Sequence, residues 1–156
     1  MALLLKNILF TVVIPGTVAV YLPLAIARGR SISSSPLWLV IGLALLALGL
    51  ASYTWCVWDF ASFGRGTPLP IDAPRKLVVR GLYRYTRNPM YLGVIAAVAG
   101  WAALFGMVWI LAYASALAVC CHVFVVLYEE PRLQELFGSE YESYRRAVPR
   151  WLPRPR

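Results

Sequence analysis

Long uncharged runs separated by short polar segments dominate the pattern of this chain. Residues 7–27 and 37–58 form uncharged runs of 21 and 22 positions. At 1.5 Å per residue, either run can cross a hydrocarbon core of roughly 30 Å as a helix. The first run ends in Ala25-Ile26-Ala27, which resembles a signal-peptide cleavage site. Its length and its two prolines, Pro15 and Pro23, nevertheless favour a retained span whose freed carbonyls are satisfied by neighbouring helices.

A third uncharged run, residues 89–128, covers 40 positions. As one helix it would be about 60 Å long, twice the thickness of the hydrocarbon core. It must therefore fold back, and Phe105-Gly106-Met107 is the expected break. The pattern predicts third and fourth spans over 89–105 and 107–128, joined as a tight hairpin.

Composition and charge agree with a membrane protein. The 156 residues are 60% hydrophobic and 14% charged, with a mean hydropathy of +0.67. A soluble domain of this size could not bury that much apolar surface. The net charge of +8 invites a nucleic-acid interpretation. Its basic residues flank the apolar runs, however, as the positive-inside rule requires, so we expect no nucleic-acid partner.

The basic residues also predict the orientation. They gather in the segment 59–88 and in the tail 129–156, whereas 28–35 holds only Arg28 and Arg30. We therefore predict one all-α, multi-pass domain in the cytoplasmic membrane, with four spans and both termini in the cytoplasm. The glycine- and proline-rich run 64–70 is either a linker or a flap over a site.

The tail should add an amphipathic helix at the cytoplasmic membrane surface. Gly138 is expected to interrupt it. Its apolar positions recur at helical spacing: Leu133, Leu136, Phe137, Tyr141, Tyr144 and Val148.

Two segments place polar chemistry at the same membrane face. Asn88 is a favoured N-cap and Pro89 a favoured first helical residue, so a helix start with Arg87 beside it predicts an anion site. Glu129-Glu130 is expected to end the fourth span, where carboxylates oppose the helix dipole. A carboxylate there can hold a cationic ligand or accept a proton.

Metal chemistry is not indicated by the sequence. The three cysteines, Cys56, Cys120 and Cys121, lie inside apolar runs, and adjacent residues on a helix cannot face one ligand. His122 cannot form a metal site by itself. We expect no metal ion.

Two ordered motifs resemble the superfamily of isoprenylcysteine carboxyl methyltransferases and phospholipid methyltransferases. The first is residues 76–93, Lys-Leu-Val-Val-Arg-Gly-Leu-Tyr-Arg-Tyr-Thr-Arg-Asn-Pro-Met-Tyr-Leu-Gly. The second is residues 129–144, Glu-Glu-Pro-Arg-Leu-Gln-Glu-Leu-Phe-Gly-Ser-Glu-Tyr-Glu-Ser-Tyr, followed by Val148-Pro149-Arg150. The resemblance implies methyl transfer from S-adenosylmethionine to a lipophilic acceptor that arrives sideways from the bilayer, between spans.

The resemblance also implies roles for individual residues. It would put Glu129 near the amino group or sulfonium of the methyl donor. Together with the anion site at Arg87 and the carboxyl pair, which can accept a proton, this predicts Arg87, Glu129 and Glu130 as the catalytic residues. The remaining cofactor-binding positions it implies are Lys76, Leu77, Val78, Tyr83, Asn88, Pro89, Tyr91 and Gly93.

Two departures from the superfamily pattern bear on the acceptor. Asn88 stands where many members have His, and Val125 stands where the carboxyl methyltransferases carry an Arg that pairs with the acceptor carboxylate. A neutral or amine lipid therefore fits better than a carboxylate. The same departures suit an alternative, a non-catalytic membrane scaffold with the same fold. A transporter using Asp59, His122 and Glu129 as a proton relay is a third hypothesis, disfavoured by the absence of repeat symmetry.

Overall fold

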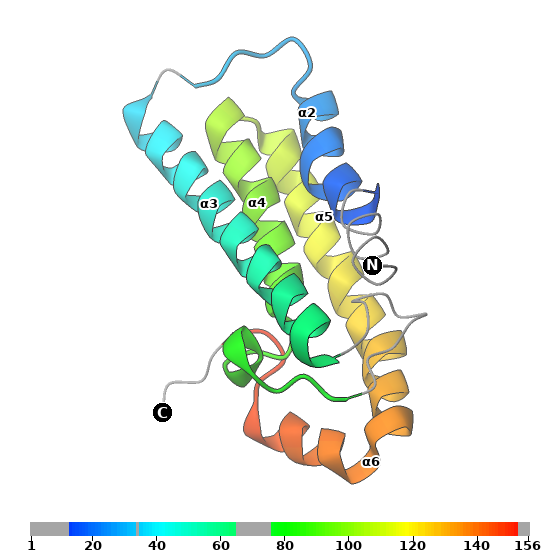
Figure 1. The fold of residues 1–156 in the computed structure, drawn as a ribbon. Coiled ribbons are helices and arrows are strands. Elements are labelled where there is room, and N and C mark those ends of the chain that lie inside the picture. Colours follow the sequence, from blue (N-terminus) through cyan, green and yellow to red (C-terminus); the bar gives the residue numbers. More distant parts are fainter. Residues whose placement is uncertain (1–12, 34, 65–75, 153–156) are drawn as a thin grey trace.

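The computed structural model describes residues 13–33, 35–64 and 76–152. The beginning of the first predicted span and the glycine- and proline-rich run beyond Gly64 lie outside the described residues. Within the described ranges the chain is helical and contains no strand. Figure 1 shows the main helices side by side, with the C-terminal helix turned across one end of the bundle.

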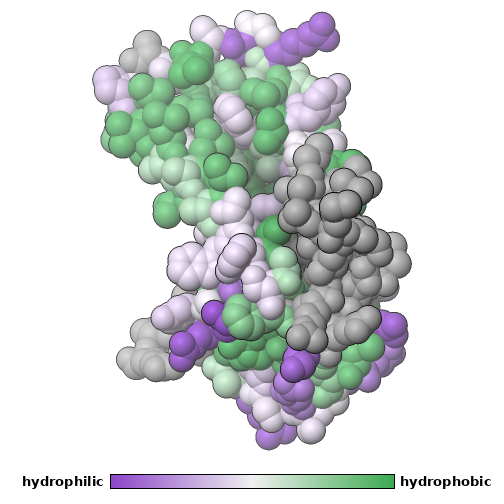
Figure 2. Space-filling model, viewed as in Figure 1, coloured by the Kyte–Doolittle hydropathy of each residue, from purple (hydrophilic) through white to green (hydrophobic). Residues whose placement is uncertain are grey.

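Two of the described helices are long and apolar enough to cross a membrane, Pro36–Phe63 and Val108–Ala147. Two shorter apolar helices, Val13–Ile26 and Pro89–Phe105, pack beside them. Hydrophobic side chains cover much of the bundle, and hydrophilic ones lie at its two ends, mainly at the end where the C-terminal helix lies (Figure 2).

The first helix contains the π-helical turn η1 (Thr17–Tyr21) and then α2 (Leu22–Ile26). Pro23 has no backbone N–H to donate to Ala19 one turn earlier. The Ala19 carbonyl instead accepts a hydrogen bond from the indole of Trp101, at 2.9 Å. The neighbouring Val18 carbonyl accepts one from the Tyr113 hydroxyl, at 3.0 Å. The expectation that other helices satisfy the carbonyls near a proline is confirmed for Pro23, whereas the turn before Pro15 lies outside the described residues.

Helix α3 (Pro36–Asp59) packs antiparallel against α4 (Pro89–Phe105) through paired glycines. A Cβ added to Gly42 would lie 2.9 Å from the Gly100 carbonyl oxygen, and one added to Gly93 would lie 2.9 Å from that of Gly49. Small residues at these positions let the two backbones approach closely. Helix α3 ends later than predicted, because no breaker follows Trp58, and the helix continues as the π-helix η2 (Phe60–Gly64).

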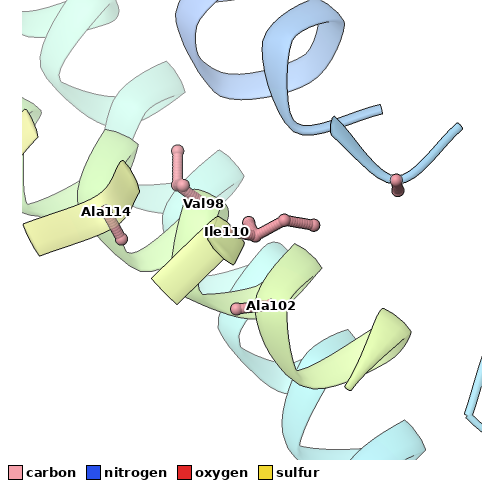
Figure 3. Packing of buried hydrophobic residues seen from close by; sticks show 5 residues of the cluster. Val98, Ala102, Ile110 and Ala114 are labelled. Carbon is pink, nitrogen blue, oxygen red and sulfur yellow. The ribbon is translucent and has the colours of Figure 1, made fainter. Parts of the chain in front are cut away.

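Helices α4 and α5 (Val108–Phe124) form the predicted hairpin. Gly106 ends α4 with φ +60°, a left-handed conformation that glycine adopts without strain. Beyond the turn, Val98 and Ala102 of α4 pack with Ile110 and Ala114 of α5 (Figure 3). The predicted break at residues 105–107 is confirmed.

The prediction that Glu129-Glu130 end a helix is wrong. The chain passes from α5 through the π-helix η4 (Val125–Glu129) directly into α6 (Glu130–Ala147). Pro131 lies in the first turn of α6, where its missing N–H is tolerated. Glu130 therefore lies within a continuous helical run, and its backbone N–H donates to the Val125 carbonyl. Gly138 does interrupt α6, with φ 51° and ψ −122°.

Candidate functional site at the end of the bundle

The segment before α4 is held against α3 and α6. The 3-10 turn η3 (Gly81–Arg84) buries Tyr83 with Cys56 and Val78. The hydroxyl of Tyr144 on α6 donates a hydrogen bond to the Tyr83 carbonyl, at 2.8 Å. Burial raises the pKa of Tyr83 well above its ordinary value, so this phenol stays neutral. Tyr83 thus joins three parts of the chain that are distant in sequence.

Asn88 occupies the N-cap position of α4, with Pro89 following in the first turn, as predicted. Its side chain, however, makes no capping hydrogen bond. The Asn88 amide instead donates to the Arg150 carbonyl, at 3.0 Å, and the Thr86 hydroxyl donates to the same oxygen, at 3.1 Å. The expectation of side-chain capping is wrong, because the folded-back C-terminus offers this buried amide a carbonyl acceptor.

Glu130 lies between two arginines. Its Oε1 is 2.9 Å from Arg87 Nη1 and 2.6 Å from Arg150 Nε, and Arg150 Nη2 donates to Oε2 at 3.0 Å. Burial alone would raise the pKa of Glu130, but the bond from Arg150 and the charges of Arg87 and Arg150 outweigh it and lower the pKa. Glu130 is therefore a fixed anion that positions both guanidinium groups.

Arg87 has a buried donor without a hydrogen-bond partner beside its satisfied groups. Its Nη1 also donates to the Tyr141 hydroxyl at 3.0 Å, and its backbone N–H donates to the Pro149 carbonyl at 3.0 Å. Its Nε is buried and has no hydrogen-bond partner. A buried, unpaired donor on a charged group is costly, and an anionic ligand group would satisfy it.

Glu129 has a different environment from its neighbour. Its Oε2 accepts a hydrogen bond from the Tyr91 hydroxyl, at 2.8 Å. Burial raises the pKa of Glu129, and the charge of Glu130 adds to this effect. The hydrogen bond from Tyr91 lowers the pKa, but by less. The two adjacent carboxyl groups are therefore driven apart in pKa, Glu130 down and Glu129 up. Such divergence is typical of sites where one group holds charge and the other can take a proton.

The end of the chain straps this site. Residues 149–151 cross from the start of α4 to α5, where the Trp151 indole donates to His122 Nδ1 at 3.0 Å. In Figure 1 this last described segment runs beside the segment that precedes α4. The strap fixes the position of Arg150, a residue that sequence reasoning counted only as a tail charge within the second motif.

Two cavities flank the Tyr91–Glu129 bond. A small polar one, of about 20 Å³, is bounded by Arg87, Glu129, Glu130 and further residues that include Val125 and Tyr141. A larger apolar one, of about 340 Å³, has Tyr91 in its wall.

The other predicted residues lie apart from one another. Leu77 packs against the cluster of Tyr141, Tyr144 and Val148, while Val78 lies in the Tyr83 cluster and Lys76 is exposed. Pro89 is buried at the start of α4. Gly93 faces α3.

Sequence reasoning gave Asp59 no role in this site. It is buried at the end of α3, and its Oδ1 lies 3.3 Å from Arg80 Nε. Its Oδ2 has no hydrogen-bond partner and lies against Gly81, whose φ is +54°. The sequence signal that could have indicated this role is that Asp59 is an isolated charge at the end of an apolar run. Asp59 holds the turn that presents Tyr83.

A model of the phospholipid methyltransferase family matches residues 37–140. The chain belongs to this family. The family is part of the superfamily of integral-membrane methyltransferases, which confirms the resemblance seen in the two motifs. Membership indicates a methyltransferase that acts on lipid-type substrates, and the apolar helices agree with an integral membrane protein. Comparisons with curated proteins and with solved structures found no match.

Proposed function

We propose that this family member crosses the membrane four times as one domain, with both termini and the site in the cytoplasm. The α4–α5 hairpin and the two preceding helices would be the spans, and residues 107–128 would form the last of them. The support is electrostatic, because basic residues gather at one end of the described bundle. They are Lys76, Arg80, Arg84, Arg87, Arg132, Arg145, Arg146 and Arg150. Helix α6 would then lie at the headgroup level, with its buried tyrosines facing the bundle.

We further propose that the site transfers a methyl group from S-adenosylmethionine to a lipophilic acceptor. The observation that carries this proposal is that two groups of opposite charge line one polar cavity. They are Arg87, whose Nε has no hydrogen-bond partner, and the Glu129 carboxyl group. A methionyl group carries a carboxylate, an ammonium and, in this cofactor, a sulfonium. The donor set fits these charges: Arg87 suits the carboxylate and Glu129 suits the cations.

The described polar cavity, about 20 Å³, holds no more than a water-sized group. We therefore expect binding to move α6, whose interruption at Gly138 lets its second half shift separately. The cofactor supplies an electrophilic methyl group when bound. Glu130 would keep Arg87 and Arg150 in place, and Tyr83 and Tyr144 would shape the wall beside them.

For the acceptor, we propose an amine or neutral lipid. Glu129 is the residue that would take the proton that an ammonium headgroup must lose before methylation, because its pKa is raised. Tyr91 would orient the Glu129 carboxyl group through its hydroxyl. Val125 is buried at the polar cavity and offers no cation for an acceptor carboxylate.

Calorimetry tests the cofactor site. Purified protein in detergent should bind S-adenosylmethionine with micromolar affinity. Arg87→Ala and Glu129→Gln should each weaken binding by about tenfold or more, because each removes a charge-assisted contact. Arg132→Ala and Glu135→Gln are matched controls, since that exposed pair lies on α6 away from the site. Wild-type protein that binds no cofactor in several detergents would refute the proposal.

Transfer itself is tested with membranes and radiolabelled S-adenosylmethionine. Label should enter the extracted lipid rather than protein or base-labile ester, and Glu129→Gln should abolish this. Cofactor binding with no label in any fraction would instead support the non-catalytic scaffold.

A further inference from the structure

Arg80 is held in a fixed orientation beside the end of α3, although its side chain is half-exposed. Its guanidinium carbon lies 3.3 Å from the centre of the Phe63 ring, and its Nε lies 3.3 Å from Asp59 Oδ1. Asp59 is buried, whereas 49% of the Arg80 side chain is exposed. The aromatic ring and the carboxylate therefore fix the plane and the direction of the guanidinium group without covering it.

The outer edge of this guanidinium group has no protein partner. Neither Nη1 nor Nη2 of Arg80 pairs with any residue that the structure describes. These two nitrogens form a fork whose spacing matches two oxygen atoms of one phosphate group. An arginine that is already held in place loses little side-chain entropy when it binds such a group. The free edge of Arg80 is thus prepared for an oxyanion.

The position of Arg80 in the fold decides which oxyanion can reach it. Phe63 is the last residue of the apolar helix Pro36–Phe63, so Arg80 lies at the level where the hydrocarbon core meets the headgroups. Trp55, an exposed residue of α3, lies beside Gly81, the residue that follows Arg80. Exposed tryptophans are typical of this level of a membrane. The oxyanion present at this depth is the phosphate group of a phospholipid.

The charge of the surrounding segment favours the same ligand. Asp59 neutralises one positive charge at this place, but residues 76–88 contain four basic residues and no acidic one. Lys76 and Arg84 are both exposed, and neither forms an ion pair with a described residue. Basic segments next to a membrane-spanning helix attract the anionic headgroups of the membrane surface.

We propose that Arg80 binds the phosphate group of a membrane phospholipid whose acyl chains lie beside Trp55. The bound lipid would anchor the segment 76–88, which contains Tyr83 and Arg87, to the membrane surface. This lipid site is independent of methyl transfer, since it requires only that α3 crosses the membrane.

Native mass spectrometry of the purified protein in detergent tests the lipid site. The probes are dioleoyl phosphatidylglycerol, dioleoylglycerol, which lacks the phosphate, and inorganic phosphate. Wild-type protein should bind phosphatidylglycerol in preference to dioleoylglycerol. Asp59→Asn combined with Arg80→Gln leaves no charge unpaired and should weaken phosphatidylglycerol binding by about tenfold, because the charged fork is lost. Arg132→Gln combined with Glu135→Gln is the matched control, since it removes an exposed ion pair of α6.

The variants and the probes separate the possible results. Unchanged phosphatidylglycerol affinity in the variant of Asp59 and Arg80, or an equal loss in the control, would overturn the proposal. Equal binding of dioleoylglycerol would overturn it as well, because apolar contact alone would then explain the adducts. Displacement of the lipid by inorganic phosphate would assign the guanidinium edge to a soluble anion instead.

A second variant covers the case in which the first does not fold. Arg80→Lys keeps a positive charge beside Asp59 but has no fork, so it should also weaken phosphatidylglycerol binding, and unchanged binding would overturn the proposal. Calorimetry with S-adenosylmethionine on the same samples keeps the two proposals apart. Phosphatidylglycerol binding by a wild-type protein that binds no cofactor would refute the proposed function and leave the lipid site standing.

Discussion

Replacing Glu130 with Gln removes the negative charge that lies between Arg87 and Arg150. The side chains of Arg87 and Glu130 are only 9% and 11% exposed, so solvent cannot compensate for the lost charge. Opening a buried ion pair from one side costs about 3–5 kcal/mol, and Gln can still accept one hydrogen bond, so we expect about 3 kcal/mol. For a chain of this size that corresponds to a fall in Tm of roughly 6–12 °C.

Thermal unfolding followed by circular dichroism in detergent micelles measures this change. Glu135→Gln is the matched control, because Glu135 also pairs with an arginine on α6 but is 69% exposed. Exposed pairs contribute little, so the control should melt with the wild type. Equal Tm values for Glu130→Gln and Glu135→Gln would refute the conclusion that this ion cluster holds α6 against the start of α4.

The pH dependence of the same difference has a defined sign. The pKa of Glu130 is lowered in the folded protein. Its contribution is therefore complete above the ordinary carboxyl pKa of the unfolded chain and is lost as the pH falls through the lowered folded value. The Tm values of wild type and Glu130→Gln should differ fully at neutral pH and converge in acid. A constant difference in Tm down to low pH would contradict this.

Three further substitutions probe the fold around the site. Gly49→Leu should separate α3 from α4 and destabilise the protein by about 1–3 kcal/mol, measured by thermal unfolding. The control Ala47→Leu, at an exposed position of α3, should leave the stability unchanged. Gly81→Ala should lower the free energy of unfolding by about 1–2 kcal/mol, because alanine is strained in the left-handed backbone of this position. The added methyl group should also displace Asp59, so calorimetry should show weaker cofactor binding. Tyr144→Phe should cost about 1–2 kcal/mol, because it leaves the buried Tyr83 carbonyl without its donor, and an unchanged Tm would contradict this.

Much of the helical architecture followed from local pattern. The start of α4 at Pro89 and the turn at Gly106 were predictable, because proline restricts the backbone and a 40-residue apolar run exceeds one membrane thickness. The interruption at Gly138 was predictable for a related reason, since only glycine adopts its backbone conformation freely.

The helix end at Glu129-Glu130 could not be judged from local signals. The paired charges suggested a stop, yet the chain stays helical through them, with Pro131 in the first turn of α6. The cost of burying Glu130 is offset by Arg150, which is 20 residues further along the chain. Contacts at that separation are not encoded by any local pattern.

The sequence by itself determined which residues meet at one end of the bundle. The first motif contains Arg87 and Tyr91, the second contains Glu129 and Glu130, and the helix pattern brings the two motifs together. Only the tertiary structure decided their roles. Two adjacent glutamates have the same intrinsic chemistry, and their different neighbours make Glu130 a paired anion and Glu129 a group with a raised pKa. Those neighbours come from α4, α6 and the C-terminal strap, so the electrostatic environment exists only after the chain has folded.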